Sequence, residues 1–152
     1  MKNLACGCPG ANVRTLDRPE TNNAPSRESR PSELRQWPTQ LHLVPPTAPY
    51  LQNADLLIAA DCVPFAYADF HQDFIKGKVL VNACPKLDDT SPYVDKLAEI
   101  IADNKVKSVT VTIMEVPCCR GLAMMAEAAV KQSGRDIPVE IAVIGVNGER
   151  RA

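Results

Sequence analysis

The alternation of apolar and polar positions from about residue 54 onward predicts a chain of alternating strands and helices. Short apolar or β-branched runs predict four strands, at residues 56–61, 78–83, 108–116 and 138–146. Apolar positions at helical spacing predict three intervening helices, at residues 65–75, from the Ser91–Pro92 pair onward, and at 119–133. Gly77 and Gly134 stand where two of these helices should stop.

This β-α-β-α-β-α-β order predicts one small α/β domain with a Rossmann- or flavodoxin-like parallel sheet. Crossovers between parallel strands are almost always right-handed, and we expect the strand order 2-1-3-4 with helices on both faces. The domain should cover residues 34–152. Its first part, residues 34–49, contains Trp37 and several prolines, and should therefore be extended and packed against the rest.

Residues 1–33 have a different character. They are rich in Pro, Asn, Ser and Arg, and they show no apolar periodicity after the sequence C-x-C-P-G that contains Cys6 and Cys8. The pattern predicts a flexible, extended N-terminal segment rather than a second domain.

Charge and cysteine usage narrow the function classes. The net charge is −1 and no Lys/Arg-rich run occurs, which argues against nucleic-acid binding; no apolar stretch is long enough to span a membrane. Too few residues precede Cys6 for a secretory signal, so we expect a cytoplasmic protein. Six cysteines in a reducing compartment favour metal binding or redox chemistry over disulfides.

The cysteines follow the predicted strands. Cys62 and Cys84 come after the first two strands, and the pair Cys118–Cys119 follows the third. The carboxyl ends of parallel strands meet at one sheet edge, where ligands bind, and three neighbouring strands would spread their cysteines over roughly 10 Å. That spread favours an iron–sulfur cluster, usually held by four thiolates, over one tetrahedral zinc ion. Cys119, Cys6 or Cys8 could supply the fourth ligand.

Other residues offer weaker candidates. His42 and His71 are expected to be ordinary surface or core-edge residues, Asp61 and Glu115 to be solvated or capping groups, and Asp88–Asp89 to cap a helix. No G-x-G-x-x-G or phosphate loop supports a nucleotide cofactor. Buried cysteines also serve as small apolar residues, so each thiol alone is ambiguous.

Two alternative functions stay open. The first is a metal-free redox thiol enzyme that uses Cys118 or Cys119, which requires a thiol with a lowered pKa. The second is a zinc-stabilised docking module that contacts a larger complex through residues 37–50. The spread of single cysteines over separate strands favours the cluster, because zinc sites more often use paired C-x-x-C hooks.

Several long motifs carry a family resemblance. They are S-E-L-R-Q-W-P-T-Q-L-H-L-V-P-P-T-A-P-Y (32–50), A-D-L-L-I-A-A-D-C-V-P-F-A-Y-A-D-F-H (54–71), G-K-V-L-V-N-A-C-P-K-L-D-D (77–89) and M-E-V-P-C-C-R-G-L (114–122). With these motifs the sequence resembles iron–sulfur-binding proteins of anaerobic bacteria and archaea that are labelled ferredoxins. The resemblance covers residues 6–148.

Members of that group begin with a ferredoxin module carrying two [4Fe–4S] clusters, followed by G-C-P-G and this α/β domain. The present sequence contains the G-C-P-G segment (Gly7–Gly10) but no such module before it. The resemblance therefore implies a cluster-binding α/β domain with Cys62, Cys84, Cys118, Cys119 and Cys8, and not a dicluster ferredoxin.

The resulting interpretation is a [4Fe–4S] protein that supports electron transfer with a redox partner protein in an anaerobe. It is more an electron-transfer or cluster-binding protein than a stand-alone enzyme. A cluster shared within a homo-oligomer is an open alternative, since Cys6 and Cys8 could reach a neighbouring chain.

Overall fold

The fold is a four-stranded parallel sheet covered by helices. The structure is a computed structural model that describes residues 14, 16–17 and 29–152. The strands are β1 (Asp55–Ala60), β2 (Val79–Ala83), β3 (Ser108–Met114) and β4 (Val139–Ile144). All neighbouring pairs are parallel, and the spatial order is β2-β1-β3-β4, which confirms the predicted strand order.

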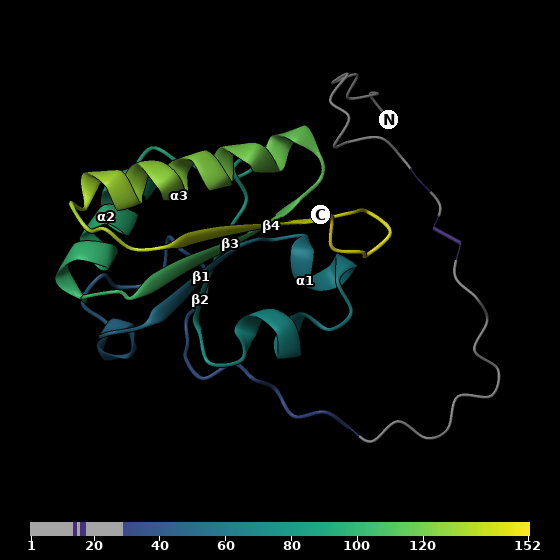
Figure 1. Cartoon of the computed structure of the whole chain (residues 1–152), viewed down its shortest axis with the longest axis horizontal. Helices are drawn as coiled ribbons and strands as arrows, with labels where there is room; N and C mark the ends of the chain where they lie inside the picture. Colours follow the sequence, from purple (N-terminus) through teal and green to yellow (C-terminus); the bar gives the residue numbers. More distant parts are fainter. Residues whose placement is uncertain (1–13, 15, 18–28) are drawn as a thin grey trace.

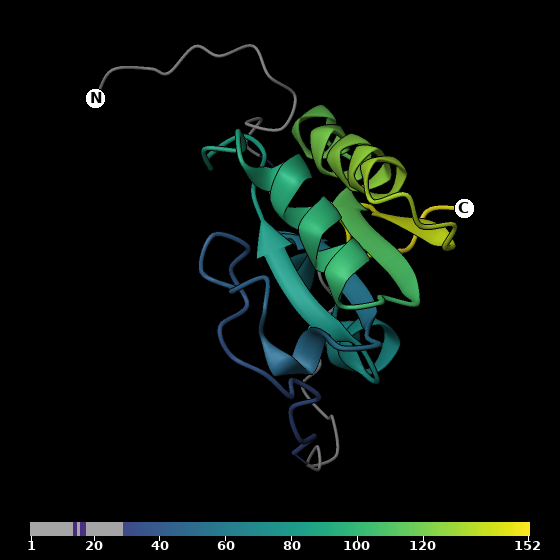
Figure 2. The ribbon, with the colours of Figure 1, turned by 90° about the vertical axis from the view of Figure 1, so that its left-hand side faces the viewer.

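Helices lie on both sides of this sheet, as Figures 1 and 2 show. Helices α2 (Tyr93–Asp103) and α3 (Arg120–Gln132) pack side by side on one face. The short helix α1 (Val63–Ala66) and the π-helix η3 (His71–Ile75) connect β1 to β2 on the other side. The central strand β1 is buried almost along its whole length, which agrees with its continuous apolar sequence.

The predicted single helix over residues 65–75 is wrong. The chain instead forms α1, leaves the helical conformation at Tyr67 (φ −102°, ψ 111°), and then forms η3. The Tyr67 hydroxyl donates a hydrogen bond to Asp73 across this break, while Phe70 and Phe74 are buried. Phe70 and Phe74 are four residues apart, a spacing that also suits a continuous helix, and the break lies before both of them.

Two predicted helix starts also differ from the structure. Helix α2 begins at Tyr93 after Pro92, and Ser91 does not cap it; the Ser91 backbone N–H and hydroxyl both donate to Asp89 Oδ1 instead. Before α3, residues Pro117–Cys119 form the short 3₁₀ helix η4, so the α-helix begins one residue after Cys119. Gly77 and Gly134 have φ of +76° and +70°, the left-handed geometry of helix ends.

The proline-rich segment before β1 covers the outer edge of β2. The Asn82 N–H donates to the Thr39 carbonyl, and the Leu41 N–H donates to the Asn82 carbonyl. The Gln36 side chain donates to the Leu80 carbonyl at 2.6 Å. These bonds satisfy backbone groups that a sheet edge would otherwise expose. The 3₁₀ helix η2 (Pro49–Leu51) then leads into β1.

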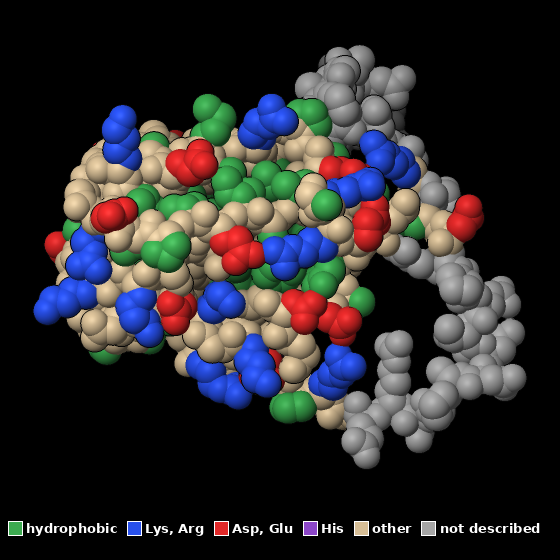
Figure 3. Space-filling model, in the orientation of Figure 1, with side chains coloured by type: hydrophobic (Ala, Val, Ile, Leu, Met, Phe, Trp, Pro, Cys, Tyr) green, Lys and Arg blue, Asp and Glu red, His purple; other side chains and the backbone are tan. Residues whose placement is uncertain are grey.

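The surface mixes both signs of charge. Figure 3 shows acidic and basic side chains interspersed over one face, without a large field of either sign. No described helix is long and apolar enough to cross a membrane.

Candidate metal centre

Four cysteines lie where the central strands end. Cys62 follows β1 and is the N-cap residue of α1, Cys84 directly follows β2, and Cys118 and Cys119 lie in η4 between β3 and α3. Because all strands are parallel, these positions share one edge of the sheet, the edge at which α1 lies in Figure 1. Helix α1 also contacts both β1 and β3, which brings Cys62 towards the end of β3.

A close approach joins the two outer cysteine turns. Strand β1 lies between β2 and β3, so Cys84 and Cys119 follow strands that are not neighbours in the sheet. A Cβ atom added to Gly121, in the first turn of α3, would lie 3.6 Å from the Pro85 Cβ. The turn after Cys84 therefore packs directly against the start of α3.

The thiols of Cys62, Cys84 and Cys118 lie close enough to influence one another. The pKa of Cys62 is raised first by burial of its sulfur and then by Cys84, Asp61 and Cys118. Cys62 as a residue is exposed, so solvent weakens the burial effect. The positions of the three residues at the ends of β1, β2 and β3 place them at one edge of the sheet.

Cys119 is the buried member of the set. It is 6% exposed, and burial raises its pKa to about 11, while a hydrogen bond from the Met114 backbone acts in the opposite direction. The neighbouring Cys118 and Cys62 raise the pKa further. Deprotonating several of these thiols together is unfavourable without a positive charge among them. A metal centre supplies such a charge.

A polar network holds the Cys84 turn. The Cys84 backbone N–H donates to Asp88 Oδ2 at 3.0 Å, and the buried Tyr93 hydroxyl and the Gln40 side chain donate to the same oxygen. Burial pushes the pKa of Asp88 upward, but the three hydrogen bonds, from Tyr93 first, outweigh burial and lower it. We predicted a helix cap here; Asp88 instead anchors the turn, a role that its spacing of four residues from Cys84 could have suggested.

The remaining predicted residues have other partners. His42 packs on the Tyr93 ring with centroids 4.7 Å apart, and His71 Nδ1 accepts a hydrogen bond from the Glu33 N–H. Glu115 accepts from the Val146 N–H and forms an ion pair with Arg151. Cys6 and Cys8 lie outside the described residues. Within the described part of the chain, no three or more His, Cys, Asp or Glu side chains form a group that could hold a metal ion.

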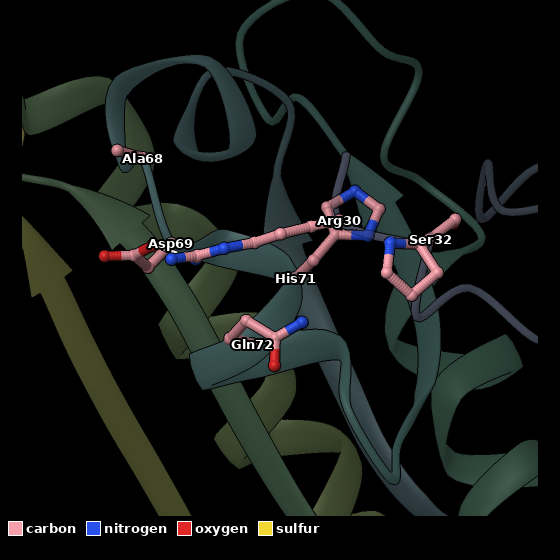
Figure 4. A pocket seen from close by; sticks show the side chains of 7 residues that line it. Arg30, Ser32, Ala68, Asp69, His71 and Gln72 are labelled. Atoms are coloured by element: carbon pink, nitrogen blue, oxygen red, sulfur yellow. Dashed lines mark hydrogen bonds and ion pairs between the residues drawn. The ribbon is translucent and has the colours of Figure 1, made fainter. Parts of the chain in front are cut away.

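A polar pocket of about 270 Å³ lies between the segment at residues 30–32 and the loop at residues 68–72. In Figure 4 the Arg30 side chain reaches toward Asp69, and the two form an ion pair at 2.8 Å. Gln72 donates to Glu33 at 3.1 Å. These groups satisfy one another, and the cysteines do not line the pocket. It is therefore a contact between two segments rather than part of the thiol edge.

Comparison with known proteins gives a fold family but no activity. Residues 48–150 match the family model described as a Rossmann-like domain. A protein of Archaeoglobus fulgidus, described as an uncharacterized protein, is 34% identical over 116 residues, covering 76% of this chain and 81% of its own. No solved structure matches the chain significantly.

Proposed function

We propose a function from the premise that the chain belongs to the Rossmann-like domain family: it binds an iron–sulfur cluster of the [4Fe–4S] type at the carboxyl edge of its sheet. The bound cluster would serve electron transfer or redox support of a partner enzyme in an anaerobe. This role rests on the thiols and the motif resemblance, because a Rossmann-like fold alone is compatible with many activities.

One observation carries the proposal. Cysteines that follow three parallel strands and precede one helix lie at a single edge of the sheet. In parallel α/β sheets this edge is the usual ligand site, at the point where the strand order reverses. Here that point lies between β1 and β3, beside Cys62 and Cys118.

A cluster fits the thiols better than a single ion does. Zinc requires its sulfur ligands within about 2.3 Å of one point. The described residues contain no such single-ion group, whereas a four-iron cluster spreads its ligands more widely. Cysteines spread over the ends of three strands are therefore more compatible with a multi-iron centre than with the zinc alternative.

The thiol-enzyme alternative is disfavoured by the thiol chemistry. A nucleophilic cysteine needs a lowered pKa, usually next to a cation or a helix N-terminus. Cys119 occupies an N-cap position, but burial raises its pKa to about 11. That environment suits a thiolate bound to metal better than a free nucleophile.

We assign Cys62, Cys84 and Cys118 as the core ligands, with Cys119, Cys8 or Cys6 as the fourth. Reach permits the N-terminal candidates. Arg14 forms a 3.9 Å ion pair with Glu115, the residue that follows β3. Cys8 lies six positions before Arg14 in the sequence, and that length of chain can span at most about 20 Å.

The test is the iron, acid-labile sulfide and zinc content of anaerobically purified protein, with its visible spectrum. About four iron and four sulfide per chain, with a brown colour that dithionite bleaches, would support the proposal. About two per chain would indicate a smaller or shared cluster. Zinc alone, or no metal after attempted reconstitution, would contradict it.

The ligand assignment has its own test. Cys84→Ser should lower the iron bound per chain, because serine replaces a soft thiolate with a hydroxyl. Far-ultraviolet circular dichroism of the apoprotein checks that the variant still folds. Unchanged iron per chain in a folded variant would remove Cys84 from the ligand set. The same measurement on Cys119→Ser, Cys8→Ser and Cys6→Ser identifies the fourth ligand.

A further inference from the structure

An apolar groove lies next to the thiol edge and is not explained by the proposed cluster. Its volume is about 260 Å³, and it opens between Trp37 and Phe65. Phe70, Ile75 and Leu80 form its buried base. The groove joins segments far apart in sequence, since Trp37 lies before β1 and Phe65 lies in α1.

The two aromatic walls are unusually exposed. Trp37 is 77% exposed and Phe65 is 91% exposed. Neither ring packs on another ring among the described residues, whose aromatic contacts involve other side chains. Large exposed apolar groups that border a groove indicate a binding surface. Both walls are therefore available to stack on a planar group.

One end of the groove is polar and accepts hydrogen bonds. The Asn82 side-chain amide donates to Asp61 Oδ1 at 2.7 Å, and both residues line the groove. No described residue donates to the second oxygen of Asp61. One of the two Asn82 N–H groups is engaged by Asp61, so this end presents two acceptors, the second Asp61 oxygen and the Asn82 carbonyl, beside one remaining Asn82 N–H. A matching ligand must bring an N–H donor.

Size restricts the ligand further. Typical small-molecule pockets measure about 300–1,000 Å³, so this groove suits one ring system rather than a dinucleotide. The sequence also lacks a glycine-rich phosphate loop. A quinone carries only acceptors and would face the Asp61 carboxylate without a hydrogen bond.

We propose that the groove between Trp37 and Phe65 binds a planar heteroaromatic ring whose N–H edge faces Asp61. Flavin-type rings have this shape, with an N–H group between two carbonyls. Asp61 immediately precedes Cys62, so the bound ring would lie beside the thiol edge. The groove residues contain no cysteine, and binding therefore does not depend on a cluster.

The experiment titrates the full chain with lumiflavin and follows tryptophan fluorescence. Trp37 is the single tryptophan of the sequence, so the signal reports on the groove wall directly. Saturable quenching is expected for lumiflavin. N3-methyl-lumiflavin, the same ring without its N–H donor, should bind about tenfold more weakly, as should menadione, because the part-buried Asp61 oxygen would lose its partner.

Variants locate the ring. Phe65→Ala should weaken lumiflavin binding about tenfold by removing one stacking wall. Met124→Ala removes an exposed apolar side chain on α3, outside the groove, and should leave binding unchanged. Cys62→Ser should also bind lumiflavin normally, which separates failure of the cluster proposal from failure of this one.

Three results would overturn the inference. Equal affinity for lumiflavin and its N3-methyl derivative would contradict the hydrogen bond from the ring N–H to Asp61. Equal affinity of wild type and Phe65→Ala for lumiflavin would contradict binding in the groove. Sedimentation velocity supplies the third: a dimer that Phe65→Ala dissociates would mean that a second copy of the chain covers the groove.

Discussion

The two edges of the sheet use their polar groups in opposite ways. At the amino edge, the buried Asn104 side chain donates to the Pro46 and Ile100 carbonyls and accepts from Gln52. The Asn104 backbone carbonyl also accepts from the Asn53 N–H. At the carboxyl edge, burial and then the neighbouring Cys84, Asp61 and Cys118 raise the pKa of Cys62, while the second oxygen of Asp61 accepts no hydrogen bond from the described residues.

This difference distinguishes structural closure from binding capacity. A polar set whose members satisfy one another stabilises the fold and offers little to a ligand. A set of neighbouring thiols is costly to deprotonate, and a positively charged partner would therefore stabilise its thiolate form most. Position at a strand end does not separate the cases, because Glu115 also follows a strand and is fully engaged by Val146 and Arg151.

The largest expected effect is the loss of bound iron from the carboxyl edge in a variant that still folds. Cys62→Ser should lose most of the bound iron, because it removes a proposed core ligand. The free energy of unfolding of the Cys62→Ser apoprotein should lie within about 0.5 kcal/mol of the wild-type value, since Cys62 is exposed. Iron analysis and urea unfolding of the apoprotein measure the two quantities. If Cys62→Ser kept its iron but lost stability, Cys62 would have a structural role and not a ligand role.

The second prediction concerns loss of the hydrogen-bond network at the amino edge. Asn104→Ala removes a side chain that is 1% exposed and leaves two carbonyls and the Gln52 amide without their partner. Such buried losses cost about 2–4 kcal/mol of unfolding free energy. Urea unfolding of the apoprotein measures it.

Iron bound per folded chain should stay at the wild-type value in Asn104→Ala. Gln52→Ala is the matched control, because it deletes one hydrogen bond of the same network and should cost only about 1 kcal/mol. Equal, small losses in both variants would show that the network contributes little to stability.

The fold was predictable because its signals are local and repeated. Four apolar runs with intervening helical periodicity define a parallel sheet, and right-handed crossovers leave few strand orders to consider. The errors fell at the ends and interruptions of helices. The helix expected at residues 65–75 is interrupted at Tyr67, and the Ser91 hydroxyl donates to Asp89 instead of capping α2.

The site was predictable only as a set of positions. The sequence pattern predicts Cys62 and Cys84 at one edge of the sheet, because parallel strands end together. Burial of Cys119 and the contact between Pro85 and Gly121 depend on how η4 and α3 pack, which no local pattern encodes. The groove at Trp37 was missed for the same reason: its walls are 28 residues apart in the sequence.

The third prediction sharpens the contrast within the carboxyl edge. In the reduced apoprotein, iodoacetamide at pH 8 should label Cys62 at least about tenfold faster than Cys119, because Cys119 is buried with a pKa of about 11. Mass spectrometry of peptides at early times measures the order. Rapid labelling of Cys119 would instead favour the metal-free thiol enzyme. Unfolded protein, in which both thiols react at similar rates, is the control.

The smallest expected effect concerns the start of β1. The Ser108 hydroxyl donates to Asp55 Oδ1 at 2.7 Å, and this bond is the main cause of the lowered pKa of Asp55. Burial opposes the shift, and Lys107 at 3.4 Å adds to it. A carboxyl whose pKa is lower in the folded state stabilises the fold above its unfolded pKa, near 3.9, and loses that contribution as the pH falls through its folded pKa.

Asp55→Asn should therefore cost a few tenths of a kcal/mol at pH 7, because the carboxylate is 38% exposed and solvent screens its interactions. The difference from wild type should shrink as urea unfolding is repeated from pH 7 down to pH 3. Asp103→Asn, at the end of α2, removes the same charge without the Ser108 bond and serves as the control. A difference between wild type and Asp55→Asn that stays constant with pH would assign the effect to the altered hydrogen bond rather than to the charge, and would place Asp55 among the purely structural groups of the amino edge.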